Sequence, residues 1–417
     1  MTPPSLSDGA LGRSPVAVQP ATSSLVDAPE LVETLRREPF RIFFPLAFVI
    51  GAAGVLHWVL LAGGVIDLYL AQFHAVSQMQ GFMLALACGF LLTAIPKRTR
   101  TEPASWPEIV ALLVLVPAVS LAALFDALAA AEVAYALALL VVAQFAVRRF
   151  AARGAGRRPP ASFTIVPVGL AAGLGGAALI IAATRGAPGW TLVLGRSLVL
   201  EGVFSCLVLG VGAFFLALAL RGDAPPDLTL ARRDVARGAA YALAGLVSIG
   251  SLFLQDLVNV RAGLLLRAAV FVGVFVSAGA HRLPSRPGLN RRVIWLSVWA
   301  IPLGLVAAAV VPAHRIAAMH VAYVGGFGLL ALTVATHVAL GHTGFDAQQS
   351  GRPWPVAVFG ALFAVAAGMR ATAVTMPDVY FAWLGVAASI WLLGVVVWAA
   401  YLLPKMGRVP ASAEAPP

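Results

Sequence analysis

Long apolar runs alternate along the chain with short segments rich in Arg, Pro and Gly. A helix needs about 20 apolar residues to cross about 30 Å of hydrocarbon. By this length criterion the sequence predicts 12 spans, at residues 45–66, 72–95, 107–127, 131–147, 163–184, 196–219, 236–256, 263–280, 293–311, 315–340, 354–375 and 379–403. We therefore expect an all-α fold, a polytopic transmembrane helical bundle.

The remaining segments suggest how the chain is organised around this bundle. Residues 39–404 are predicted to form a single transmembrane domain, while the Ser/Pro/Ala-rich segment 1–38 and the end 405–417 are predicted to be disordered cytoplasmic tails. The division between the third and fourth spans rests on two acidic residues, Asp126 and Glu132.

Composition supports a membrane protein and gives an orientation. Hydrophobic residues make up 60% of the chain and charged residues 11%, whereas soluble domains carry roughly 25% charge. The net charge of +11 comes mainly from Arg and Lys in alternate loops, which predicts that both termini face the cytoplasm. Basic and aromatic residues are not interleaved in any segment, so we expect the lipid bilayer as partner and no nucleic acid.

Ionisable side chains within apolar segments are candidate functional residues, because burying them in a bilayer is costly. In the predicted orientation most of them lie near the outer face. They are His57 in the first span, His74 in the second, Arg196 and Glu201 in the sixth, Arg267 in the eighth, His314 and His320 at the start of the tenth and Arg370 in the eleventh. A further histidine, His342, is placed at the inner end of the tenth span.

The second span carries one stripe of small or polar residues at helical spacing: His74, Gln78, Gly81, Ala85 and Cys88. Such a stripe should face the bundle interior. A histidine above small residues leaves room for a flat cofactor. The alternative is close helix packing, with His74 hydrogen-bonded to a loop.

The tenth span shows a similar arrangement, because His320 is followed by Gly325, Gly326 and Gly328. These glycines would clear space beside a ligand of His320. The alternative is a hydrogen bond from His320 to another helix. His314 lies six residues earlier and roughly on another face, so one continuous helix would not bring both histidines to a single metal.

Glu201 needs a partner at its depth, and Arg196, Arg267 and Arg370 are the candidates. These pairs could be structural, or the arginines could hold the propionates of a haem, since Arg binds carboxylates in a two-pronged geometry. Motifs for catalysis are absent from the sequence. We therefore assign no catalytic residue, and the sequence leaves open whether the protein is an enzyme.

Three segments resemble the NnrS family. Residues 39–44, PFRIFF, are similar to its PFRxFF opening; residues 74–96, HAVSQMQGFMLALACGFLLTAIP, follow its HAHEMxFGF…GFLLTAVP segment; and residues 320–344, HVAYVGGFGLLALTVATHVALGHTG, resemble its HAxxxGxxGxxxLxxMxRxxLGHTG segment. The resemblance implies a multi-pass protein of the bacterial cytoplasmic (inner) membrane that contains haem and copper and is linked to nitric oxide and nitrosative stress.

Carried over position by position, the resemblance places His74, His320 and His342 at motif histidines. Val76 and Ser77 stand where the family motif has His and Glu. Two ligand candidates are therefore missing from the outer end of the second span, which weakens the expectation of copper more than that of haem.

These observations lead to two functional hypotheses. The first is an NnrS-like haem protein with His74 and His320 as axial ligands, with His57, His314 and His342 as further candidate metal ligands. Two axial histidines would suit electron transfer, and one open position would let nitric oxide bind; the sequence does not identify a redox partner. The second is a 12-span secondary transporter of a small anionic substrate, bound by buried arginines.

Overall fold

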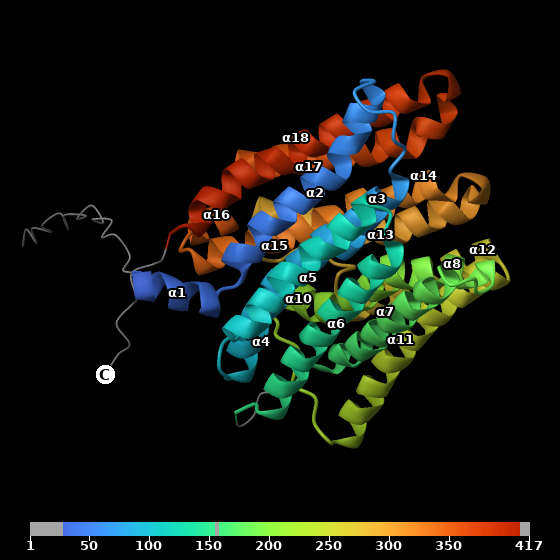
Figure 1. Ribbon diagram of the computed structural model, residues 1–417. Coiled ribbons are helices and arrows are strands. Elements are labelled where there is room, and N and C mark those ends of the chain that lie inside the picture. Colours follow the sequence, from blue (N-terminus) through green and yellow to red (C-terminus); the bar gives the residue numbers. More distant parts are fainter. Residues whose placement is uncertain (1–27, 155–157, 409–417) are drawn as a thin grey trace, which may run out of the picture.

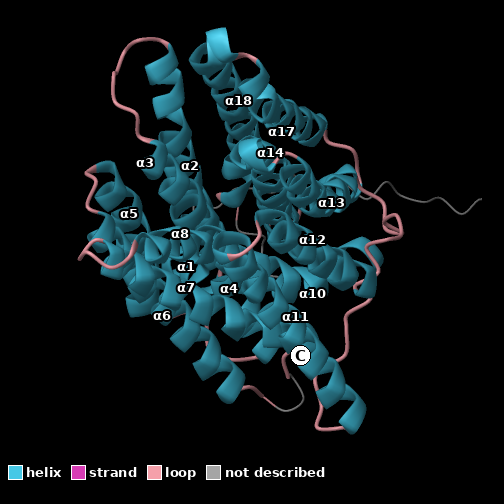
Figure 2. Cartoon of the chain, turned by 90° about the vertical axis from the view of Figure 1, so that its right-hand side faces the viewer, coloured by secondary structure: helices cyan, strands magenta, loops and turns pink. Residues whose placement is uncertain are grey.

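The structure is a computed structural model, and it describes residues 28–154 and 158–408. Within this part of the chain 12 helices are long and apolar enough to cross a membrane, in agreement with the predicted count. They run at Phe40–Ala62, Ala71–Thr99, Trp106–Leu124, Leu128–Ala151, Ala161–Ala183, Gly189–Arg221, Arg232–Leu257, Val260–Ser277, Leu289–Val310, Pro312–His342, Trp354–Thr375 and Pro377–Met406. The described chain is thus a helical bundle, as expected (Figures 1 and 2).

The boundary between the third and fourth spans, which the sequence defined least clearly, is a tight turn. Helix α5 (Trp106–Leu124) begins with a capping box, in which Glu108 accepts from the backbone and the hydroxyl of Ser105. Asp126 then takes a left-handed backbone conformation (φ 55°), and α6 begins at Leu128 and ends at Ala151. The predicted split is correct, but Glu132 lies inside α6, where it is buried.

The second, sixth and tenth spans form the interior of the bundle. Their central windows are 83%, 72% and 67% buried, against 33–56% for the other nine spans. All three contain π-helical segments, at Ser77–Phe82, Leu198–Gly202, Val208–Gly212, Ala217–Arg221 and Val321–Gly328. Such segments are rare and are frequent at functional sites.

Small residues let these inner spans approach their neighbours closely. A Cβ added at Gly304 of α13 (Leu289–Val310) would lie 2.4 Å from the backbone nitrogen of Ala322 in the tenth span. At Gly81 it would lie 2.5 Å from the Ser120 hydroxyl of α5. Such close approach of helices at small residues is typical of helix packing in membranes.

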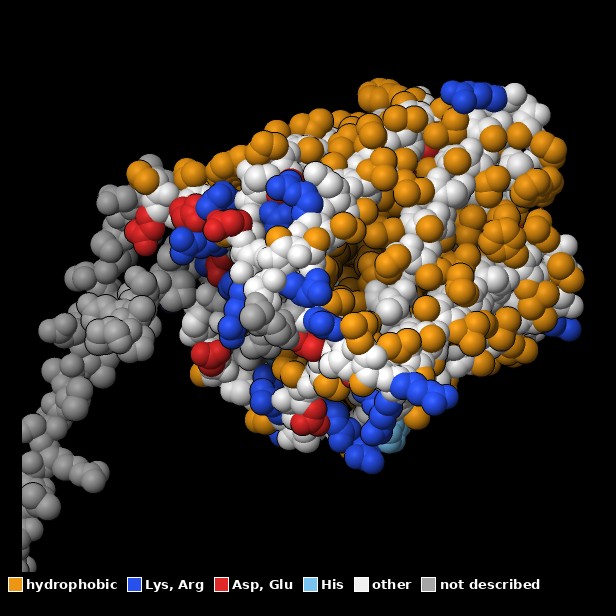
Figure 3. Space-filling model, turned by 90° about the horizontal axis from the view of Figure 1, so that it is seen from below, with side chains coloured by type: hydrophobic (Ala, Val, Ile, Leu, Met, Phe, Trp, Pro, Cys, Tyr) orange, Lys and Arg blue, Asp and Glu red, His pale blue; other side chains and the backbone are white. Residues whose placement is uncertain are grey.

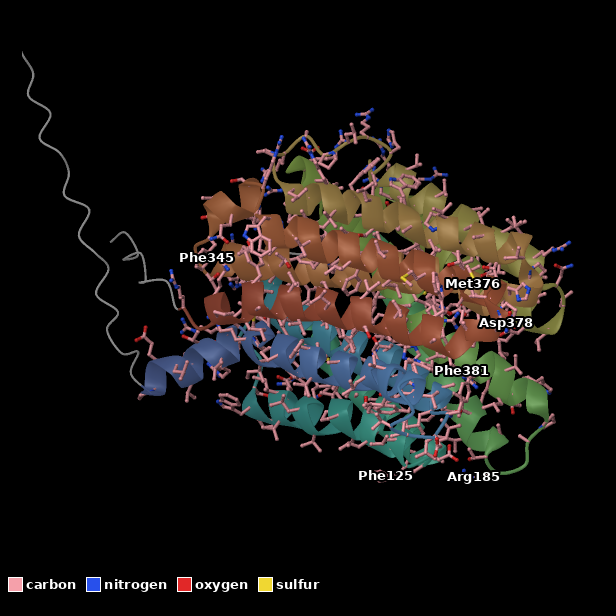
Figure 4. The ribbon with its side chains drawn as sticks, turned by 90° about the horizontal axis from the view of Figure 1, so that it is seen from above. Phe125, Arg185, Phe345, Met376, Asp378 and Phe381 are labelled. Carbon is pink, nitrogen blue, oxygen red and sulfur yellow. The ribbon has the colours of Figure 1, made fainter. Side chains whose placement is uncertain are left out.

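Both described chain ends lie at one end of the bundle, which we call the terminal end. There Arg41 of α2 (Phe40–Ala62) donates a hydrogen bond to the carbonyl oxygen of Met406, the last residue of α18 (Tyr380–Met406). Figure 4 shows Phe345 at the terminal end and loop residues Phe125 and Arg185 at the opposite end. The side on which the cytoplasm lies stays a prediction, which basic side chains near the terminal end favour (Figure 3).

The predicted tails differ from the structure at their edges. Residues Ala28–Arg37 form helix α1, in which Glu33 pairs with Arg36 and Arg37. The sequence predicted disorder for this part of 1–38, where the structure has a helix; ion pairs three and four residues apart stabilise such an amphipathic helix. Helix α18 continues to Met406, two residues beyond the predicted boundary at 404. Residues 1–27 and 409–417 lie outside the described chain.

Candidate functional site

A cavity of about 470 Å³ lies mainly among the first, second, sixth, tenth, eleventh and twelfth spans. We call it the histidine cavity, because His74 and His320 both line it. Most of its wall is apolar and includes the aromatic side chains of Trp58, Phe82 and Trp391. An apolar cavity of this size with a few polar groups is typical of small-molecule and cofactor sites.

The imidazole rings of His74 and His320 are each fixed by one hydrogen bond from Nδ1 to a backbone carbonyl oxygen. The Nδ1 of His74 lies 2.9 Å from the carbonyl oxygen of Gly54, and the Nδ1 of His320 lies 2.6 Å from that of Ile316. A carbonyl oxygen can only accept, so each Nδ1 carries the proton and donates it. Each Nε2 is then left with a free lone pair, which is the form of histidine that binds a metal.

His57 packs behind His74 without lining the cavity. The two imidazole rings are 5.8 Å apart, and the Nδ1 of His57 also donates to the Gly54 carbonyl oxygen, at 3.2 Å. The Nε2 of His57 is buried and has no hydrogen-bond partner in the described chain. His57 thus supports the position of His74 and keeps one nitrogen unused.

Glu201 lines the cavity and is held by two side chains. Arg267 Nη2 donates to its Oε2 at 2.6 Å, and the Tyr323 hydroxyl donates to its Oε1 at 2.9 Å. Arg267 is 1% exposed and also donates to Gln255 Oε1 at 2.7 Å. Of the three arginines that the sequence offered as partners, Arg267 is therefore the one that pairs with Glu201.

This network continues to the neighbouring cavity wall. Gln255 donates to Asp256 Oδ1 at 2.9 Å, and Arg315 lies 3.6 Å from the same oxygen. Sequence reasoning did not single out Gln255 or Asp256. The sequence signal for these two residues is that they form a polar pair, Gln255 and Asp256, at the end of the otherwise apolar seventh span.

Arg196 and Arg370 also line the cavity, but they are not neutralised. Neither forms an ion pair within 4.0 Å in the described residues. Arg370 is near Tyr380, and its Nη1 is buried without a hydrogen-bond partner in the part of the chain that the structure describes. Two cationic side chains beside an apolar cavity suit a ligand with carboxylate or other anionic groups.

The structure does not bring the other candidate histidines to this cavity. His314 is exposed in a shallow hollow that Asp378 and Tyr380 also line. His342 lies at the terminal end, where its Nδ1 donates to Glu38 Oε1 at 2.9 Å. In the described ranges no three His, Cys, Asp or Glu side chains gather as they would around a metal ion.

Glu38, outside the spans, has a strongly shifted pKa. Burial opposes ionisation of its carboxyl group, but hydrogen bonds from His342 and Arg41 outweigh burial and lower the pKa of Glu38 to about 2. Lys97 Nζ lies 3.4 Å from the same carboxyl group. This cluster joins the ends of the first, second, tenth and twelfth spans, so its role is to hold helices together.

Comparison with known proteins identifies a family. The model of the family described as NnrS protein matches residues 34–409, nearly the whole chain. A search of curated proteins gives no match.

Proposed function

Because the chain belongs to the NnrS protein family, we propose that this multi-pass membrane protein is a haem protein of the nitric oxide stress response. We place it in the bacterial cytoplasmic (inner) membrane, with haem held between His74 and His320 near the periplasmic side. One observation carries the proposal: two histidines from separate spans line the same cavity, each with Nδ1 bound to a backbone carbonyl and Nε2 free.

The rest of the cavity wall fits such a group. Trp58, Phe82 and Trp391 offer flat apolar surfaces for a macrocycle. Arg196 and Arg370 are the unpaired cations that would bind its propionates, since guanidinium groups match carboxylates well. Arg267 is not assigned this role, because Glu201 already neutralises it.

Haem, when bound, would supply an iron centre that can carry an electron or bind nitric oxide. The residues of this chain orient and protect it. The carbonyl oxygens of Gly54 and Ile316 fix the two imidazole rings, and the apolar wall excludes water. Copper is not part of the proposal, because Val76 and Ser77 provide no imidazole or carboxylate beside His74.

The direct test is the haem content of protein purified from cells supplied with haem. We expect a Soret band, a pyridine haemochrome signal proportional to the protein, and a spectral shift when nitric oxide is added to the reduced protein. A folded, colourless protein from these cells would contradict the proposal.

The unpaired arginines also favour a second candidate, a secondary transporter of a small anionic substrate. In that case Arg196 and Arg370 would bind the anion directly. The protein would be colourless, and proteoliposomes would take up a labelled carboxylate or nitrite in a way that Arg370→Gln abolishes. A Soret band without such uptake would exclude this candidate.

A further inference from the structure

A second buried polar site lies behind the second span. Glu132 of α6 is 1% exposed, and Gln80 of the second span is fully buried. The Gln80 amide Nε2 donates to Glu132 Oε2 at 2.9 Å. No Lys or Arg of the described residues lies within ion-pair distance of Glu132. A carboxyl group is thus held inside the bundle by a neutral amide.

The hydrogen bonds of this pair are incomplete. The second oxygen of each side chain, Glu132 Oε1 and Gln80 Oε1, is buried and has no hydrogen-bond partner among the described residues. With an ionised Glu132 both atoms would be acceptors that lack a donor, and a buried charge without a counter-ion costs several kcal/mol. A proton on Glu132 removes the charge and supplies a donor.

Glu132 is connected electrostatically with the histidine cavity. Arg196, which lines the histidine cavity, is the cation that acts electrostatically on Glu132. The Tyr135 hydroxyl lies on the same helix, and the buried thiol of Cys88 faces it from α4 (Met83–Thr99).

Other charges near α6 are distant or already paired. At its terminal end Arg149 pairs with Glu108 of α5 at 2.9 Å, and Arg148 lies 3.7 Å from the same carboxyl group. Asp126 is exposed in the turn before the helix, and α7 (Val166–Ala183) carries no titratable residue. Lys97 and Arg98 lie at the terminal end of α4.

We propose that Glu132 and Gln80 form a buried proton-binding site, in which Glu132 is a neutral acid that exchanges its proton in response to charge in the histidine cavity. Arg196 links the two electrostatically, because it lines the cavity and its charge acts on Glu132. When the site releases its proton, the O–H bond of the Glu132 carboxyl group breaks and the proton passes to water. When the site binds a proton, the same bond forms again. Neither step moves an electron. The site does not depend on haem, so its test stands apart from that of the proposed function.

Infrared spectroscopy of the protein in lipid nanodiscs tests the site directly. We expect a C=O band of a protonated carboxylic acid that moves in D2O and is missing in Glu132→Gln. Glu108→Gln is the matched control and should keep the band, because Glu108 is buried but paired with Arg149. Gln80→Leu should shift the band without removing it, which keeps the test valid if Glu132→Gln folds poorly.

Coupling to the cavity is tested with Arg196→Gln. The loss of this cation favours the neutral acid, so the band should persist to higher pH than in the unmodified protein. Two results would overturn the proposal: a carboxylate signal from Glu132 at every pH, or a band whose pH dependence ignores Arg196→Gln. An ionised Glu132 with sodium-dependent thermal stability would instead assign the site to a metal cation and would also overturn it.

Discussion

At the terminal end Glu38 accepts hydrogen bonds from Arg41, Lys97 and His342. At the histidine cavity, in the described residues, Arg196 and Arg370 form no ion pair, because the carboxylate that lines the cavity, Glu201, pairs with Arg267. Both regions use His and Arg at the edge of a bilayer. In the first, the partners come from the first, second and tenth spans of the same chain, so the contacts fix the bundle. In the second, imidazole nitrogens and guanidinium groups remain free, which indicates a ligand site.

The sharpest test of this comparison replaces one histidine in each region. His74→Ala or His320→Ala should abolish the Soret band, because each removes an axial ligand. His342→Ala is the matched control and should keep the band, since His342 lies at the terminal end, where it contacts Glu38 and Lys97. Absorption spectra of the three purified variants decide the result. Loss of haem only in His342→Ala would reverse the assignment.

Arg267 belongs to the cavity end but behaves as a structural residue. Arg267→Met should destabilise the protein by about 3–5 kcal/mol, because Glu201 would be left as a buried charge without a counter-ion. Thermal unfolding followed by circular dichroism measures the effect. The double variant Arg267→Met, Glu201→Gln should recover much of the loss, and no recovery would argue against the ion pair.

The unpaired arginines should act on haem affinity more than on stability. Arg370→Gln and Arg196→Gln should each weaken haem retention roughly 10–100-fold, the effect typical of residues that support a bound group. Competition for haem with apomyoglobin measures it. Arg352, which lies in a loop, supplies the control Arg352→Gln. Equal retention in all three variants would remove the arginines from the site.

The smallest expected effect concerns pH at the terminal end. The pKa of Glu38 is lowered from its ordinary value of 4.5 to about 2, so Glu38 stabilises the fold fully above about pH 4.5 and loses this contribution as pH falls toward 2. Glu38→Gln should lower Tm by a few degrees at neutral pH and flatten this acid dependence. The haem spectrum of Glu38→Gln should stay unchanged. An altered spectrum would mean that the terminal end affects haem binding at the histidine cavity.

Much of this fold follows from the sequence. The apolar runs and basic loops predicted all 12 spans, because lipid leaves a spanning segment few alternatives to a helix. The stripe from His74 to Cys88 correctly placed the second span in the interior. The cavity position of His74 and His320 agrees with the hypothesis that they converge, although haem binding itself stays a prediction.

Other features required the structure. Glu132 marked a span boundary in the sequence, yet it packs inside α6 against Gln80, because local pattern does not show which helix faces lie together. Only spatial packing could choose Arg267 over Arg196 and Arg370 as the partner of Glu201. The π-helical segments in the inner spans also leave no simple periodic signal.

Whether haem occupies the histidine cavity can be seen in a density map of the purified protein in lipid nanodiscs. We expect flat density inside the cavity, joined to the Nε2 atoms of His74 and His320, with its carboxylates toward Arg196 and Arg370. A well-resolved map in which lipid or water fills this cavity, or in which haem binds elsewhere, would contradict this expectation.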